Sequence, residues 1–148
     1  MRRGFTMIEL VFVIVILGIL ASIAIPRLAA TRDDASATKA ATELRNALNE
    51  LAAHYVVNGQ FAADGELTGA SASLDEMSPT LAAVFARTDG DKWSECVTIT
   101  ASNADASIKI AVAANTSSYC NAVRATPALK EWLSLTDGIK VGGSGLFK

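Results

Sequence analysis

Histidine, cysteine and proline are scarce in this sequence, which contains one His, two Cys and three Pro among its 148 residues. The single histidine, His54, has no Cys, Ser or carboxylate motif around it that would suggest a catalytic group or a metal ligand. We therefore expect His54 to be a packing or solvent-facing residue. We expect no enzymatic activity, no catalytic residue, no cofactor and no metal.

The sequence also lacks clustered positive charge. Its 13 Lys and Arg are outnumbered by 15 Asp and Glu, and aromatic residues make up only 6% of the chain. Proteins that bind nucleic acid need a basic patch, and those that bind single strands also need aromatic side chains on which bases stack. We therefore do not expect nucleic acid as a partner.

Charge is absent altogether from one long segment near the N-terminus. Residues 10–25 are apolar or small, and only Ser22 interrupts them with a polar side chain. As a helix, residues 5–25 would measure about 30 Å, which matches the hydrocarbon core of a bilayer. Arg2 and Arg3 precede the segment, and such positive charges hold the flanking end on the cytoplasmic side. This pattern predicts one helix that crosses a membrane.

Glu9 does not fit an ordinary membrane anchor, because an ionised carboxylate within the bilayer costs several kcal/mol unless it finds a partner. Cleavage after Gly4 would create an α-amino group on Phe5, four residues from Glu9. This amine would supply the missing positive charge, either in the same subunit or in a neighbour. Cleavage at this junction and the presence of Glu9 therefore explain each other.

These residues resemble a known processing signal. The sequence Gly-Phe-Thr-Met-Ile-Glu-Leu at residues 4–10 is similar to the recognition sequence of prepilin peptidase, with Met7 where leucine is commoner. Pro26 falls where type IV pilins and type II secretion pseudopilins commonly carry a proline, and the resemblance covers residues 2–32. It implies that an inner-membrane peptidase removes residues 1–4 and methylates the new amino group of Phe5. It also implies that Glu9 neutralises the amine of an adjacent subunit.

The resemblance further implies partners and a location. The chain would be a structural subunit of a type IV pilus-like filament, as a type IV pilin or a type II secretion pseudopilin. It would wait in the bacterial inner membrane as a single-pass protein with its head in the periplasm, and would then join a periplasmic or extracellular filament. Its partners would be other copies of itself, other pilins, prepilin peptidase and the inner-membrane assembly platform.

The whole chain predicts an α+β, pilin-like fold in four segments: a leader (1–4), a transmembrane and assembly helix (5–27), the amphipathic half of the same long helix (28–57), and a globular head with a small antiparallel sheet (58–148). Gly18 and Pro26 weaken the helix, so we expect it to bend or unwind between them. In the second half of the helix, apolar residues spaced three and four positions apart form one apolar face. That face consists of Ala37, Ala40, Ala41, Leu44, Ala47, Leu48, Leu51 and Tyr55, whereas Lys39, Glu43, Arg45 and Glu50 are expected on other faces.

The head is expected to begin once Asn58 and Gly59 end the long helix. The first predicted elements are a loop over residues 60–79, anchored by Phe61 and Leu67, and a short helix over 80–87. Strands are predicted at 93–100, 107–113 and 119–123. A helix over 128–135, with Pro127 suited to its first turn and Gly138 as its stop signal, and a turn at 142–145 complete the head.

Cys96 and Cys120 would lie outside the cytoplasm, where an even number of cysteines favours a disulfide. They fall on the first and third predicted strands, which we expect to lie close together. The alternative is a pair of buried free thiols. Nearby, Asp89, Asp91 and Glu95 supply oxygen atoms that could bind Ca²⁺, but they lack the full spacing of an EF-hand loop, so we assign no metal to them.

Three other functions stay open from the sequence alone. A conventional secretory signal could be cut near Ala24 or Ala30, although Glu9 and the length of the apolar span argue against it. The chain could be a single-pass anchor with no assembly role. It could also be a minor pilin that takes up DNA or binds a surface, which would need a basic or aromatic patch on the head.

Overall fold

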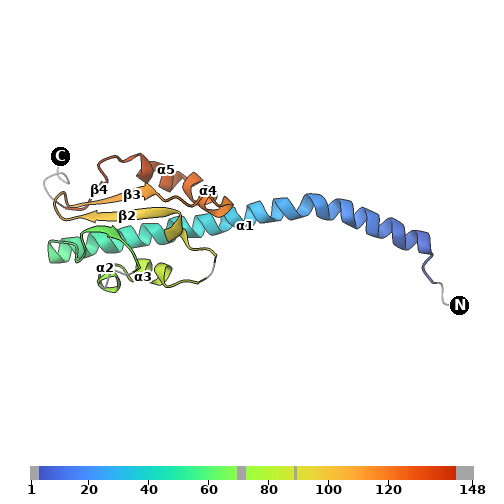
Figure 1. Ribbon diagram of the computed structural model, residues 1–148, viewed down its shortest axis with the longest axis horizontal. Coiled ribbons are helices and arrows are strands. Elements are labelled where there is room, and N and C mark those ends of the chain that lie inside the picture. The colour runs from blue at the N-terminus through green and yellow to red at the C-terminus, as the bar shows by residue number, and fades with distance from the viewer. Residues whose placement is uncertain (1–3, 70–72, 89, 143–148) are drawn as a thin grey trace. The chain divides into compact units, whose positions relative to one another are not determined.

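The computed structural model describes residues 4–69, 73–88 and 90–142. The chain divides into two compact units, residues 1–33 and residues 34–148, which are described separately below. Both units contain part of one helix, α1 (Met7–Asn58), and the second unit contains every other helix and strand of the described chain. Figure 1 shows these elements with their labels.

Helix α1 is 52 residues long and confirms the predicted long N-terminal helix. Its helical residues continue through both Gly18 and Pro26, so the bend expected between them stays a prediction. The helix ends where the sequence indicates. Gly59 adopts a φ of 74°, and its amide donates a hydrogen bond of 2.8 Å to the carbonyl of Tyr55. This left-handed conformation is one that glycine adopts without steric cost, and it stops the helix.

The head contains a four-stranded antiparallel sheet with the strand order β1-β2-β3-β4. The central strands β2 (Val97–Ser102) and β3 (Ser107–Val112) pair over six residues each. The outer strands β1 (Gly65–Leu67) and β4 (Ile139–Lys140) are short. The long helix and the antiparallel sheet together form an α+β, pilin-like architecture, as predicted.

The described part of the head also contains five short helices. These are α2 (Leu74–Met77), α3 (Pro79–Phe85), the 3₁₀ turn η1 (Trp93–Glu95), α4 (Ser118–Ala125) and α5 (Pro127–Ser134). Two of them begin with proline at the first helical position, where its missing amide costs nothing. Ser78 caps α3 by accepting a hydrogen bond from the amide of Leu81 at 3.1 Å. The predicted helices near residues 80–87 and 128–135 correspond to α3 and α5.

The hydrophobic core of the head lies between the second half of α1 and the sheet, which run side by side in Figure 1. Six of the eight apolar positions predicted on α1 are buried, and the other two, Ala41 and Tyr55, are partly buried against the core. Burial of a leucine side chain contributes roughly 1.5–3 kcal/mol. The buried members of the stripe are Ala37, Ala40, Leu44, Ala47, Leu48 and Leu51.

The strand predicted at residues 119–123 is wrong, because this segment belongs to α4. The hydroxyl of Ser117 accepts a hydrogen bond of 3.2 Å from the amide of Cys120 and caps the helix. Tyr119, Cys120 and Val123 are all buried, and this spacing places them on one helical face. Capping and this spacing favour a helix over the predicted strand.

Three other boundaries differ from the prediction. The first predicted strand starts late, because residues 93–95 form η1 and β2 begins at Val97. The predicted loop at 60–79 contains β1 and α2, although its expected anchors Phe61 and Leu67 are indeed buried. Helix α5 ends at Ser134, one residue before the predicted end at 135. Gly138, the predicted stop, has a φ of 73° in the turn before β4. Residues 143–145 of the predicted final turn lie outside the described residues.

Candidate processing and assembly site

The start of α1 is fixed by a reciprocal pair of contacts between Thr6 and Glu9. The Glu9 carboxylate accepts hydrogen bonds from the amide and the hydroxyl of Thr6, each at 2.8 Å. The Thr6 hydroxyl in turn accepts a bond of 3.3 Å from the amide of Glu9. This arrangement is a capping box, which satisfies two amides that the first helical turn leaves without partners. Glu9 therefore has a polar partner within its own chain.

The predicted cleavage junction lies just before this cap, in non-helical backbone. The side chain of Phe5 is 90% exposed. A Cβ atom placed on Gly4 would meet no other atom within 4 Å. Within the described residues, the bond between Gly4 and Phe5 is therefore accessible from both sides. A protease that binds its substrate peptide in extended form requires such access.

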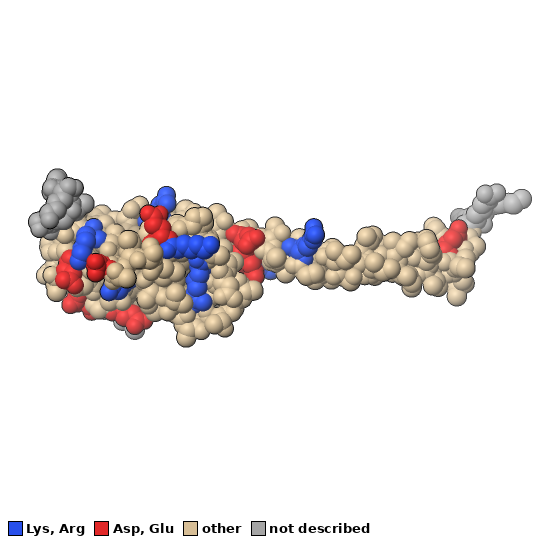
Figure 2. All heavy atoms as spheres, turned by 90° about the horizontal axis from the view of Figure 1, so that it is seen from above, with Lys and Arg blue, Asp and Glu red and all other residues tan. Residues whose placement is uncertain are grey.

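The helix that follows the junction exposes its apolar side chains. The large apolar residues from Phe5 to Leu28 are between 40% and 90% exposed. No charged residue occurs between Glu9 and Arg27, and in Figure 2 the corresponding stretch is uncharged on the visible face. This part of α1 is long and apolar enough to cross a membrane. An exposed apolar surface of this extent needs lipid or protein to cover it.

Small residues, among them Gly18 and Ser22, interrupt the bulky side chains in this span. A Cβ atom on Gly18 would meet nothing within 4 Å. Four residues later, Ser22 satisfies its hydroxyl by donating a hydrogen bond of 2.8 Å to the carbonyl of Ile19. The surface around these positions is open, and small residues four apart let another helix approach closely.

In the head, Glu43 of α1 binds two groups from the segment that follows α3. The guanidinium of Arg87 donates to both carboxylate oxygens, at 2.6 and 2.8 Å, and the indole of Trp93 donates at 3.0 Å. The Glu43 side chain is only 17% exposed. The hydrogen bonds from Arg87 hold the pKa of Glu43 below its ordinary value and outweigh the opposing effect of burial.

Glu50, seven residues after Glu43 and about two helical turns further along α1, also binds groups from outside the helix. Its carboxylate accepts bonds from the hydroxyls of Ser78 and Thr80, both at 2.7 Å, and from the amide of Thr80 at 3.1 Å. Burial raises the pKa of Glu50, but these three bonds outweigh it and lower the pKa overall. The sequence placed Glu43 and Glu50 away from the packed face. Instead, Glu50 binds the start of α3 to α1, and Glu43 binds the segment that follows α3.

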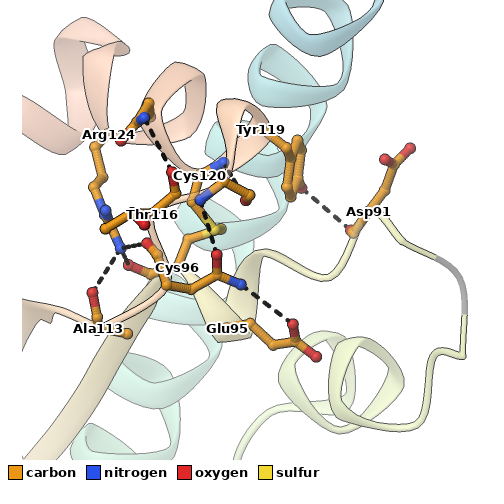
Figure 3. Close-up of a disulfide and its surroundings, with 11 residues drawn as sticks. Asp91, Glu95, Cys96, Ala113, Thr116, Tyr119, Cys120 and Arg124 are labelled. Carbon is orange, nitrogen blue, oxygen red and sulfur yellow. Dashed lines mark hydrogen bonds between the residues drawn. A yellow bond between two sulfur atoms is a disulfide. The ribbon is translucent and has the colours of Figure 1, made fainter.

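A disulfide joins Cys96 and Cys120, as predicted, with their Cα atoms 4.9 Å apart. The bond connects the residue before β2 to helix α4, and not two neighbouring strands as expected. Both cysteines are buried. Figure 3 shows the disulfide together with Arg124, whose side chain points toward Cys96 and Ala113.

The carboxylates considered for Ca²⁺ have protein partners. Asp91 accepts a hydrogen bond of 3.1 Å from the hydroxyl of Ser36, and Glu95 accepts one of 3.5 Å from the side-chain amide of Asn115. Among the described residues, no three His, Cys, Asp or Glu side chains are grouped as a metal site would require. Asp89 lies outside those residues. His54 is half-buried on α1, and its Nδ1 atom is enclosed without a hydrogen-bond partner in the described chain.

Comparison with known proteins identifies the N-terminal segment. Residues 1–25 match the family model described as the prokaryotic N-terminal methylation motif. No curated protein and no solved structure matches the chain. The matched residues include the Gly4–Phe5 junction, Glu9 and the whole apolar span of residues 10–25. This span is the first part of the long helix α1, and the small antiparallel sheet follows later in the chain. The N-terminal segment therefore carries the prepilin signature of type IV pilins and pseudopilins.

Proposed function

We propose that this chain is a structural subunit of a type IV pilus-like filament, made as a precursor that is cut between Gly4 and Phe5 and methylated on Phe5. The observation that carries the proposal is the order of features within residues 4–25. An open junction is followed by a carboxylate in the first helical turn and then by an uncharged, exposed helix. A secretory signal or a plain anchor needs no carboxylate at this position.

In the proposed pathway each segment of the chain has a defined role. Residues 1–4 are the leader, and residues 5–27 first cross the inner membrane and later pack in the filament. Residues 28–57 carry the head, residues 58–148, which faces the periplasm before assembly and the outside of the filament afterwards. The two environments of residues 5–27 are both apolar, so transfer from lipid to filament does not expose the large apolar surface to water.

Glu9 has different partners before and after cleavage. In the precursor its carboxylate is held by Thr6. Cleavage places a cationic amino group on Phe5, adjacent to Thr6 in the sequence. In a filament, the amine of one subunit would then approach the Glu9 carboxylate of its neighbour. An unpaired charge in an apolar core is costly. A subunit that is added out of register would leave both the amine and the carboxylate unpaired, so the ion pair favours addition in the correct register.

The proposed partners follow from this pathway. They are prepilin peptidase, the inner-membrane assembly platform, other copies of this chain and other pilins. Gly18 and Ser22 offer a place where a neighbouring helix can pack closely. Pro26 and Gly18 are the proposed points of flexibility that allow the helix to adjust on leaving the membrane.

The proposal is tested with Gly4→Leu expressed in a host that assembles these filaments. A bulky residue before the junction should leave full-length precursor in the membrane and abolish recovery of the chain in sheared filaments. The matched control is Gly90→Leu, because Gly90 also has nothing within 4 Å of its Cβ position. The control should be cleaved and assembled. Cleaved, filamentous Gly4→Leu protein would contradict the proposal.

A further inference from the structure

Arg124 makes an unusual set of contacts on helix α4. Its guanidinium donates to three backbone carbonyls: to Cys96 from Nε at 3.0 Å and from Nη2 at 2.8 Å, to Ala113 at 2.7 Å, and to Asn115 at 2.6 Å. These acceptors come from the residue before β2, the residue after β3 and the connection to α4. One side chain thus gathers three segments of the head at one point, as Figure 3 shows in part.

The disulfide also joins helix α4 to the residue before β2. Cys120 lies four residues before Arg124, one helical turn away and on the same side of α4. Its bonding partner is Cys96, the residue whose carbonyl accepts two of the guanidinium bonds. Helix α4 therefore contacts Cys96 twice, once through sulfur and once through Arg124.

We propose that Arg124 positions Cys120 for bonding to Cys96. The guanidinium binds backbone carbonyls, so its contacts form equally well while both cysteines are thiols. Helix α4 has only eight residues, which is too short to be stable without tertiary contacts. Docking of Arg124 holds this helix against the start of β2 and brings the two sulfur atoms within reach of each other.

The covalent step needs an external disulfide, for which glutathione disulfide serves in the test. One cysteine thiolate attacks glutathione disulfide, forms a mixed disulfide and releases one glutathione thiolate. The second cysteine thiolate then attacks the protein sulfur of that mixed disulfide and releases the second glutathione. The protein loses two protons and two electrons, and the glutathione disulfide takes them up as two thiols. Arg124 acts on the second step, whose equilibrium depends on how closely the second thiol is held.

The experiment measures the effective concentration of the Cys96 and Cys120 thiols for each other. Full-length chain in detergent micelles is equilibrated in glutathione buffers of graded composition, trapped by alkylation and analysed by mass. Arg124→Met, which keeps much of the side chain but removes every donor, should lower the effective concentration about tenfold. Arg124→Lys should lie between Arg124→Met and the wild type. Lys130→Met, on the exposed surface of α5, should agree with the wild type within about twofold.

A second measurement separates positioning from general stabilisation. Amide hydrogen exchange of the reduced Arg124→Met chain should show loss of protection in α4 while β2 and β3 stay protected. An unchanged effective concentration in Arg124→Met would overturn the proposal. Equal loss of protection across α4 and the sheet would also overturn it, because Arg124 would then stabilise the head as a whole. Neither result depends on cleavage or filament assembly, so these experiments test the role of Arg124 independently of the proposed function.

Discussion

The carboxylate of Glu9 accepts hydrogen bonds from both the amide and the hydroxyl of Thr6, each at 2.8 Å. The carboxylate is therefore already paired locally before any neighbouring subunit arrives. This pairing reduces the free-energy cost of holding a polar group near the start of an apolar helix. It also separates two roles of Glu9, capping of the helix and supply of a negative charge, which substitutions can distinguish.

Glu9→Ala should leave cleavage and membrane insertion intact but lower filament yield by at least about tenfold. The variant removes the counter-charge for the amine of Phe5 in an apolar core, and insertion becomes easier because a polar group is lost from the span. The measurement compares cleaved, membrane-bound subunit with sheared filament at matched expression.

Thr6→Val is the matched control for this experiment, because it removes the capping hydroxyl and keeps the Glu9 charge. Loss of a cap costs about 1 kcal/mol of helix stability, which a helix of 52 residues tolerates. Thr6→Val filaments should therefore form at a yield close to that of the wild type. If Thr6→Val abolishes assembly as completely as Glu9→Ala, capping rather than charge is the role of this pair.

The head should lose stability on acidification because of Glu43 and Glu50. Both carboxylates have a pKa lowered by their hydrogen bonds, so the folded state binds protons less readily than the unfolded state. Their contribution is fully present above the unfolded pKa and is lost as the pH falls through the folded pKa. Unfolding followed by denaturant titration should show stability that is level near neutral pH and falls below about pH 5.

Glu43→Gln tests which groups cause this pH dependence. The variant should lose about 1.5–3 kcal/mol at neutral pH, because the bonds from Arg87 are no longer assisted by a negative charge. Its stability should also fall less steeply with acidification than that of the wild type. Glu76→Gln, at an exposed position of α2, should match the wild type in both respects. The same pH profile for Glu43→Gln and the wild type would assign the dependence to other groups.

Exported protein should contain Cys96 joined to Cys120, and reduction should cost about 3 kcal/mol of stability. The two residues are 24 positions apart, and closing a loop of this size restricts the unfolded chain. Mass analysis of alkylated protein under non-reducing conditions identifies the linked peptides. Recovery of both cysteines as freely alkylated thiols would show that the bond is absent from the natural protein.

The long helix was predictable because its signals are local and repeated. The apolar span, the apolar residues spaced three and four positions apart, and Gly59 at the end all indicate the helix α1. The capping box was also readable as a threonine followed three residues later by a glutamate, but the charge of Glu9 alone does not reveal it. Helix α4 was missed, because five residues around Cys120 are too few to distinguish a strand from a short capped helix.

The contacts made by Glu43, Glu50 and Arg124 could not be predicted from the sequence. Their partners lie 44 and 50 residues from Glu43, 28 and 30 from Glu50, and 9 to 28 from Arg124. No local pattern encodes a pairing over such separations. A charged residue on an amphipathic helix is most often solvated, and only the folded head shows that these side chains turn inward.

The mass of the mature N-terminus tests the central claim most directly. Protein taken from the native membrane or from filaments is digested, and its N-terminal peptide is identified by mass spectrometry. A chain that begins at Phe5, with the added mass of one methyl group on its amine, is the result we predict. A chain that keeps residues 1–4, or that begins near Ala24 or Thr31, would contradict assignment of this protein as a processed pilin-like subunit.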